Sequence, residues 1–195
     1  MTRLANPPVV LLDRDGTINV NVSYLSDPEG LVLAPGAAAG LRRLHELGCR
    51  LIVVSNQSGV GRGYFDERAV RRVNEKLEEM VLEIGSRLEA CYFCPHAPEA
   101  GCACRKPEPG LVWRAAADLG FDPRQAVVIG DQASDVALGR RIGARTVLIG
   151  HPPDAGCCDP PPDCVVPGLD AAARWVEGLL ARREGSVSRS DGGGV

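Results

Sequence analysis

The chain has 195 residues, of which 45% are hydrophobic and 24% charged, and its formal net charge is -3. This size fits one ordinary domain with a single core, and the charge balance provides no broad basic surface for nucleic acid. No stretch approaches the roughly 18 apolar residues of a membrane span, and Met1 to Asn6 lacks the charged segment followed by a long apolar stretch that is typical of a secretory leader. We therefore expect a cytoplasmic monomer that binds neither nucleic acid nor membrane.

Short apolar runs rich in Val, Ile and Leu recur along the chain without polar alternation. Such runs are typical of strands that are buried on both faces of a sheet. The predicted strands are Val9 to Leu12, Leu51 to Val54, Ala90 to Phe93, Ala126 to Ile129 and Thr146 to Ile149.

Helical patterns alternate with these runs, and three of them end at a glycine that can form a left-handed C-cap. The predicted helices are Ala37 to Leu47, Asp66 to Leu88, Gly110 to Leu119, Ser134 to Ile142 and Leu169 to Arg183. This alternation predicts an α/β fold with a doubly wound, mostly parallel, Rossmann-like sheet, whose ligands bind at the carboxyl ends of the strands. We expect one domain over residues 1–184 and a disordered tail over residues 185–195.

Two carboxylates follow the first predicted strand in the motif Asp13-Arg14-Asp15-Gly16-Thr17. One aspartate can attack phosphorus to give an aspartyl-phosphate, while the other protonates the leaving oxygen and later activates water. A calcium loop would need Gly at its sixth position and Glu at its twelfth, where this sequence has Ile18 and Tyr24. A solvated turn of charged residues is the other interpretation of this motif taken alone.

Three further strand ends carry polar side chains. Ser55 follows the second strand, where a hydroxyl and neighbouring N–H groups can hold phosphate oxygens. Arg105 and Lys106 follow the third strand and open the next helix, a favourable place for phosphate. Asp131 and Asp135 follow the fourth strand and suit a hard cation such as magnesium, although Asp135 can equally cap or orient its neighbours.

Taken together, the four strand ends resemble the signatures of the haloacid dehalogenase-like phosphatase superfamily, in the same order along the chain. The resemblance implies that Asp13 is the nucleophile, that Asp15 is the general acid and base, and that Ser55 donates to a phosphoryl oxygen. It also implies that Lys106 offsets negative charge, and that magnesium binds the Asp13 carboxylate, the Asp15 backbone carbonyl and Asp131. The segments after Thr17 and Phe65 are too short for a separate cap domain, so a capless site open to a small phosphorylated metabolite is expected.

A short loop after the third strand contains Cys94-Pro95-His96 and then Cys102-Ala103-Cys104. Three thiols and one imidazole within this distance are a sufficient set for a closed tetrahedral zinc site, which is structural by default. We therefore predict structural zinc on Cys94, His96, Cys102 and Cys104. The Pro-rich segment with Cys157, Cys158 and Cys164 suggests no ligand geometry.

This zinc loop, followed by Arg-Lys-Pro, resembles the branch that contains D,D-heptose 1,7-bisphosphate 7-phosphatases and histidinol-phosphate phosphatases. The motif extended through Asn19 and the segment Ser55 to Phe65 are similar to the heptose enzymes. They imply hydrolysis of the 7-phosphate of D-glycero-D-manno-heptose 1,7-bisphosphate, in the synthesis of nucleotide-activated heptose. The short segment between His96 and Cys102 is instead similar to histidinol-phosphate phosphatases, so that activity stays as the alternative. A non-catalytic, zinc-ordered binding module is the alternative from another class.

The resemblance also implies which residues contact the substrate, with specificity expected from residues 21–24, residues 59–64 and the zinc loop. Gln132 stands where many heptose enzymes have Lys. The implied substrate contacts are Asn21, Val22, Ser23, Tyr24, Ser55, Asn56, Gln57, Ser58, Arg105, Lys106 and Gln132.

Overall fold

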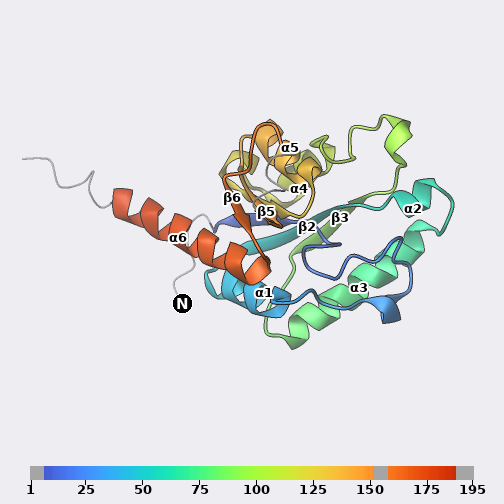
Figure 1. Ribbon diagram of the computed structural model, residues 1–195, viewed down its shortest axis with the longest axis horizontal. Helices are drawn as coiled ribbons and strands as arrows, with labels where there is room; N and C mark the ends of the chain where they lie inside the picture. The colour runs from blue at the N-terminus through green and yellow to red at the C-terminus, as the bar shows by residue number, and fades with distance from the viewer. Residues whose placement is uncertain (1–6, 152–157, 188–195) are drawn as a thin grey trace, which may run out of the picture.

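The computed structural model describes residues 7–151 and 158–187 (Figure 1). In this part of the chain, six parallel strands form one sheet in the order β3-β2-β1-β4-β5-β6. The strands are β1 Val9–Leu12, β2 Arg50–Asn56, β3 Ala90–Cys94, β4 Val127–Gly130, β5 Arg145–Ile149 and β6 Cys164–Val166. The strand order reverses between β1 and β4, as it does in Rossmann-like sheets, so the predicted fold class is confirmed.

Helices connect the parallel strands, together with three short 3-10 turns at Pro28–Gly30, Pro98–Ala100 and Pro123–Gln125. The helices of the described residues are α1 Ala37–Glu46, α2 Ser58–Gly61, α3 Glu67–Glu83, α4 Gly110–Leu119, α5 Ala133–Ile142 and α6 Leu169–Val187. Figure 1 shows α4 and α5 on one face of the sheet and α1, α3 and α6 on the other.

The core is divided by the sheet into two layers because successive strand residues point to opposite faces. Val10 and Leu12 of β1 belong to the layer under α1, α3 and α6. Val9 and Leu11 belong to the layer under α4 and α5. All four side chains are buried, which explains why β1 is an uninterrupted apolar run in the sequence.

Caps are present at both kinds of helix end. The Asp66 side chain accepts a hydrogen bond from the Ala69 N–H at 3.0 Å and so caps the start of α3. Gly48, Gly120 and Gly143 follow α1, α4 and α5 with φ angles of 75°, 65° and 73°. The prediction that a left-handed glycine ends each of these three helices is therefore confirmed.

Several bounds shift by one or two residues from the sequence prediction, and four elements differ by more or were not predicted. Helix α3 ends at Glu83 rather than near Leu88, because Gly85 takes a left-handed conformation with φ 76°. Strand β6 and the single turn α2 were not predicted, since each has too few residues for a recognisable period. Helix α6 continues through residues 185–187, which were expected to begin the tail. The predicted tail residues 188–195, and Cys157, lie outside the described residues.

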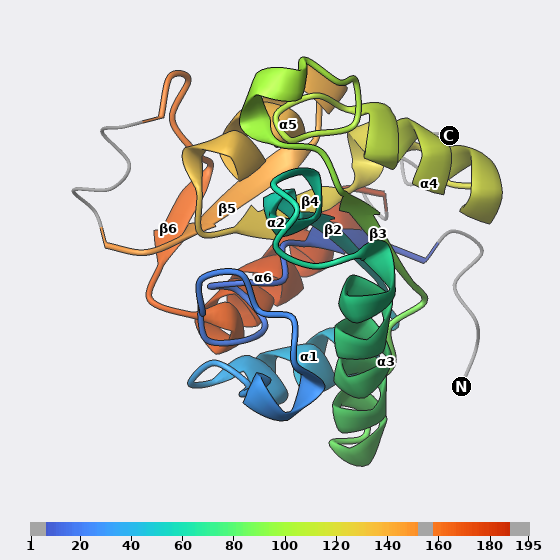
Figure 2. The same cartoon turned by 90° about the vertical axis from the view of Figure 1, so that its right-hand side faces the viewer.

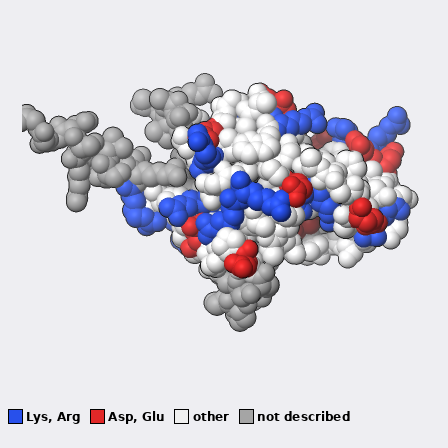
Figure 3. Space-filling view, turned by 90° about the horizontal axis from the view of Figure 1, so that it is seen from above, with Lys and Arg blue, Asp and Glu red and all other residues white. Residues whose placement is uncertain are grey.

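The face that carries α4 and α5 has many basic side chains, as Figure 3 shows, with acidic side chains beside them. Several arginines of this part of the chain are ion-paired within a few residues or across elements: Arg114 with Asp118, Arg124 with Asp122, Arg140 with Asp163, Arg141 with Glu108 and Arg145 with Asp163. These pairs neutralise much of the positive charge locally. Among the described helices, none is both long and apolar enough to cross a membrane.

Candidate active site

The sheet order brings the predicted functional side chains to one edge. Strand β1 lies between β2 and β4, so Asp13, Ser55 and Asp131 stand at the carboxyl ends of three neighbouring strands. The Asp13 N–H donates to the Ile129 carbonyl at 2.9 Å, which extends the pairing of β1 and β4 one residue further. Figure 2 turns the molecule so that this edge can be followed around α2. The site therefore lies where the strand order reverses, the usual ligand position in open α/β sheets.

Lys106 reaches this edge from the loop between β3 and α4. Its Nζ lies 2.6 Å from Asp13 Oδ1 and 2.7 Å from Asp135 Oδ1, and all three side chains are at least nine-tenths buried. Burial alone would lower the Lys106 pKa, but the two carboxylates outweigh it and raise that pKa above its ordinary value. Lys106 is therefore a cation whose charge is directed at Asp13.

Asp15 is held by hydrogen-bond donors on both of its carboxylate oxygens. Arg14 donates to Oδ1 and Oδ2 through Nη2 at 3.1 and 2.9 Å. Asn19 donates to Oδ1 at 2.9 Å and Gln57 donates to Oδ2 at 2.8 Å. These contacts fix the carboxylate in one orientation at the pocket.

Arg14 is fully buried, and its charge is matched by Asp15. Its Nη1 donates to Asn74 Oδ1 of α3 at 3.0 Å. Sequence reasoning missed the parts played by Arg14, Asn19 and Asn74. A usable signal existed for Asn74, because this polar residue interrupts the buried apolar stripe that Val70, Val73 and Leu77 form along α3.

Three carboxylates converge beside Lys106. Oxygen atoms of Asp13, Asp131 and Asp135 lie within 4.8 Å of one another. Asp131 Oδ1 is buried and has no hydrogen-bond partner among the described residues. Burial, together with the charge of Asp13, raises the Asp131 pKa to about 6.

This arrangement fits a hard divalent cation, because magnesium takes oxygen ligands and would satisfy the unpaired Asp131 oxygen. Gly16 leaves the necessary space: a Cβ at this position would lie 2.2 Å from Asp131 Oδ2. Asp135 is used differently, since its Oδ2 accepts from the Gln132 N–H at 3.1 Å and caps α5 while its Oδ1 faces Lys106. The sequence left two roles open for Asp135, binding of magnesium or capping and orienting its neighbours. The contacts in the structure support the second role.

Ser55 and its neighbours form the β2 side of the site. Ser55 is buried near the end of β2, and its Oγ accepts from Gln57 Nε2 at 3.4 Å. The Asn56 side-chain amide donates a hydrogen bond to the Lys106 carbonyl and accepts one from the Lys106 N–H. Gln57 is likewise engaged with Asp15, so these two amides organise the site from within it.

A pocket of about 380 Å³ opens in front of these groups. It contains every implied substrate contact except Ser55. It also contains Gly59, from the segment expected to determine specificity, and Leu25 and Ser134, which the sequence analysis did not link to the substrate. The pocket is lined by Asp13, Asp15, Asn21, Val22, Ser23, Tyr24, Leu25, Asn56, Gln57, Ser58, Gly59, Arg105, Lys106, Gln132 and Ser134.

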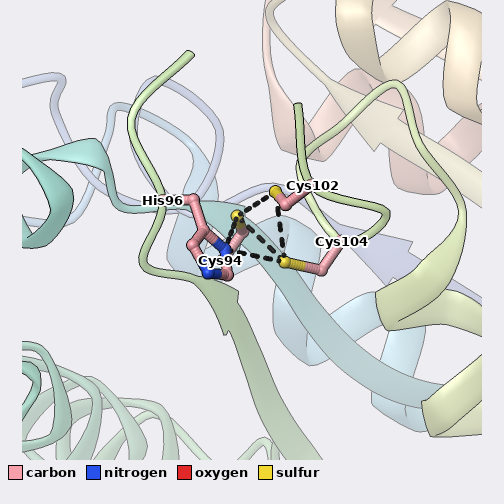
Figure 4. A group of neighbouring side chains, drawn as sticks. All are labelled: Cys94, His96, Cys102 and Cys104. Atoms are coloured by element: carbon pink, nitrogen blue, oxygen red, sulfur yellow. Dashed lines mark hydrogen bonds between the residues drawn. The ribbon is translucent and has the colours of Figure 1, made fainter. Parts of the chain in front are cut away.

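The predicted zinc ligands come together in one cluster, which Figure 4 shows with all four side chains pointing toward a common centre. Cys94 Sγ and Cys104 Sγ lie 3.6 and 3.5 Å from Cys102 Sγ, and 3.2 Å from each other. His96 Nδ1 lies 3.5 Å from Cys94 Sγ and 3.2 Å from Cys104 Sγ. A tetrahedral zinc ion with bonds of about 2.3 Å to sulfur would separate two sulfur atoms by about 3.8 Å, somewhat more than the distances here, and the convergence of three thiols and one imidazole fits zinc.

The zinc loop is joined to the pocket through backbone hydrogen bonds. The Gln57 N–H donates to the Cys94 carbonyl at 2.8 Å, and the Gly61 N–H donates to the Pro95 carbonyl at 2.7 Å. A Cβ at Gly61 would lie 2.4 Å from the Ala97 nitrogen, so the two segments pack backbone against backbone. The loop thus supports α2, and its last cysteine, Cys104, directly precedes the turn that carries Arg105 and Lys106.

Comparisons with known proteins identify relatives of this chain. Residues 103–172 match the HAD-hydrolase-like family model. The chain is 40% identical over 141 residues to the D-glycero-beta-D-manno-heptose-1,7-bisphosphate 7-phosphatase of Helicobacter pylori, covering 72% of this chain and 81% of the relative. It is 33% identical over 183 residues to the Yersinia pestis enzyme of the same name, covering 89% and 92%.

A solved structure is also similar: the D,D-heptose 1,7-bisphosphate phosphatase from B. bronchiseptica, complexed with magnesium and phosphate. It is 28% identical, has a TM-score of 0.79, and the match covers 90% of this chain and 99% of that one. Sequence identity of 33–40% to relatives of which this chain covers 81–92% establishes common family membership. The chain belongs to the D,D-heptose 1,7-bisphosphate 7-phosphatase family of HAD-like hydrolases.

Proposed function

We propose that this protein is a magnesium-dependent phosphatase that removes the 7-phosphate of D-glycero-D-manno-heptose 1,7-bisphosphate. The observation that carries the chemistry is the contact of 2.6 Å between Lys106 Nζ and Asp13 Oδ1 at the floor of the pocket. The substrate is supported by relatives that carry this activity in their names and align over most of the chain. Nucleotide-activated heptose synthesis is the pathway that this activity would serve.

In the first step, a carboxylate oxygen of Asp13 attacks the phosphorus of the 7-phosphate. The new bond is between Asp13 and phosphorus, and the bond between phosphorus and the 7-oxygen of the sugar breaks. Lys106 stabilises the charge on the nucleophile and on the transferring oxygens, and Ser55 donates to one of those oxygens. The product of this step is an aspartyl-phosphate and the free 7-hydroxyl.

Asp15 supplies the proton that the leaving 7-oxygen needs. In the second step it takes a proton from water, the water oxygen bonds to phosphorus, and Asp13 is released with inorganic phosphate. Both Asp15 oxygens accept hydrogen bonds, so one contact must open during proton transfer. Gln57 is the partner suited to this, because its amide lines the pocket whereas Arg14 is anchored in the core.

Magnesium would be held by the Asp13 carboxylate, the backbone carbonyl of Asp15 and Asp131. When bound, it neutralises the carboxylates and the phosphoryl oxygens as charge develops. Gln132 would orient the Asp131 carboxylate toward the metal, because its Nε2 donates to Asp131 Oδ2 at 2.8 Å. Zinc held by Cys94, His96, Cys102 and Cys104 would order the loop and take no part in the reaction.

A second cation in the pocket would favour recognition of a bisphosphate, because it attracts the second phosphate. Lys106 is committed to two carboxylates, and Arg105 is the other cation that lines the pocket. Its contact with the His96 carbonyl is long, at 3.4 Å, so its guanidinium can bind the 1-phosphate at little cost. The monomeric state and the cytoplasmic location expected from the sequence stay predictions.

The direct test is phosphate release from the heptose bisphosphate with purified protein and magnesium, with the product identified by phosphorus NMR. Heptose 1-phosphate is the expected product. The Asp13→Asn variant should release no phosphate while keeping the thermal transition of the parent protein. Formation of heptose 7-phosphate, or undiminished turnover by Asp13→Asn, would exclude the proposal.

A further inference from the structure

Two exposed tyrosines meet beside the pocket from different segments of the chain. Tyr24 lies in the connection between β1 and α1 and lines the pocket, whereas Tyr64 follows α2 and does not line it. The ring centroids are 4.7 Å apart and the ring planes are at 85°, the edge-to-face arrangement that aromatic pairs favour. The contact joins the segment on one side of the pocket to the segment on the other.

The Tyr24 side of this contact has few other supports. Regular pairing of the connection stops at Val20, whose N–H donates to the Val32 carbonyl at 2.9 Å, and resumes at Asp27, which caps the next turn. Between them, Leu25 is buried in the core, while Tyr24 has a φ of 57°. A non-glycine residue in this left-handed conformation costs about 1–2 kcal/mol, so surrounding contacts must maintain it. The ring of Tyr64 provides such a contact.

The Tyr64 side is firmly braced. Its N–H donates to the Gly59 carbonyl at 2.9 Å, and the ring of Phe65 fills the space where a Cβ at Gly59 would lie 2.3 Å away. Gly61 ties the same turn to the zinc loop through its hydrogen bond to the Pro95 carbonyl. Tyr64 therefore presents its ring from a fixed position to a segment that is held less firmly.

We propose that Tyr64 is a specificity-determining residue that acts through Tyr24. Its ring holds residues 21–24 as the pocket wall that faces the part of the substrate beyond the reacting phosphate. The catalytic groups come from other segments, so this wall affects how well a large substrate is bound and leaves the reaction at Asp13 unchanged. The inference rests on the proposed function for the nature of that substrate, a phosphorylated sugar.

The first test compares Tyr64→Ala, Tyr64→Phe and Leu82→Ala in full-length protein loaded with magnesium and zinc. Leu82→Ala is the matched control, because this side chain is as exposed as Tyr64, at 60% and 61%, and lies on α3 away from the pocket lining. Loss of the ring pair should raise the KM for heptose bisphosphate about 2- to 12-fold with kcat little changed. Tyr64→Phe should have the same KM as the parent protein, since the ring and not the hydroxyl makes the contact.

Acetyl phosphate separates binding by the wall from the chemistry, because only two carbons accompany its phosphoryl group. Tyr64→Ala should hydrolyse it with the kcat/KM of the parent. An unchanged KM for the heptose bisphosphate in Tyr64→Ala, an equal loss with acetyl phosphate, or a Tyr64→Phe variant as impaired as Tyr64→Ala would overturn the proposal.

Amide hydrogen exchange provides a readout that does not depend on the substrate. Exchange over residues 22–26 should become faster in Tyr64→Ala and stay at the parent rate in Tyr64→Phe and Leu82→Ala. If the parent protein fails to hydrolyse heptose bisphosphate, the proposed function is wrong, and the exchange rates still decide whether Tyr64 holds the wall. Unchanged exchange in Tyr64→Ala would show that it does not.

Discussion

The side chain of Asn56 holds the backbone of Lys106 by two reciprocal hydrogen bonds. Asn56 Oδ1 accepts from the Lys106 N–H at 2.9 Å, and Asn56 Nδ2 donates to the Lys106 carbonyl at 3.1 Å. The end of β2 thereby fixes the position of a loop that begins beyond β3. Because the Lys106 ammonium must reach both Asp13 and Asp135, this clamp determines the geometry of the central ion cluster.

Removal of the two hydrogen bonds between Asn56 and Lys106 should lower kcat and have a smaller effect on KM. We expect Asn56→Ala to reduce kcat about 10- to 100-fold, because a displacement of about 1 Å in a catalytic group has effects of this size. Asn56→Asp keeps the acceptor for the Lys106 N–H and loses the donor to the Lys106 carbonyl. Its kcat should therefore lie between that of the parent protein and that of Asn56→Ala. Steady-state kinetics with the heptose bisphosphate measure the effect, and a parent-like kcat in Asn56→Ala would contradict it.

Gly16 should control magnesium affinity. Its φ of 84° disfavours any side chain, and a Cβ would collide with Asp131 Oδ2 at 2.2 Å. Displacing a metal-binding carboxylate in this way should raise the magnesium concentration for half-maximal activity in Gly16→Ala about 10- to 100-fold.

Gly85→Ala is the matched control for the backbone effect. Gly85 has a similar φ of 76°, and a Cβ at this position would meet no other atom within 4 Å. Both variants should lose about 1–2 kcal/mol of stability from the left-handed conformation, measured by denaturant unfolding. Only Gly16→Ala should change the magnesium titration; an equal change in both variants would refute the role of Asp131.

Zinc removal should destabilise the protein without acting directly on the chemistry. A metal present at about 1,000 times its Kd stabilises the folded state by about 4 kcal/mol, which corresponds to a Tm shift of about 8–16 °C for a chain of this size. After chelation, zinc should restore the Tm and magnesium alone should not. Calorimetry with metal analysis measures this, and an unchanged Tm in zinc-free protein would disprove the assignment.

Cysteine variants test whether the loss of Tm on zinc removal comes from the predicted zinc cluster. Cys104→Ser removes a donor from the cluster and should reproduce much of the Tm loss, whereas Cys164→Ser, in the edge strand β6, should not. Equal losses in the two variants would indicate a general sensitivity to thiol replacement.

The fold could be predicted because its strands are buried on both faces and therefore stand out as apolar runs between capped helices. Val9–Leu12 and Gly110–Leu119 have the bounds that the sequence indicates. The three-residue strand β6 could not be found in this way, since it follows a Pro-rich segment and pairs only at the edge of the sheet. Its place depends on contacts with β5 rather than on a local pattern.

The candidate site was predictable where function needs a reactive side chain at a strand end. Asp13, Lys106 and Asp131 are brought together, as their positions after parallel strands require. The supporting contacts were not predictable, because they join residues far apart in sequence. The hydrogen bond between Arg14 and Asn74 and the ring contact between Tyr24 and Tyr64 depend on how α3 and two loops pack around the pocket.

The most direct test of the proposed function is a comparison of kcat/KM for both anomers of D-glycero-D-manno-heptose 1,7-bisphosphate and for histidinol phosphate, at the same magnesium concentration. We predict that one heptose anomer is preferred over histidinol phosphate by at least about tenfold, since the pocket offers Arg105 to a second phosphate. Equal or greater efficiency with histidinol phosphate would contradict it and would assign the pocket to a monophosphate.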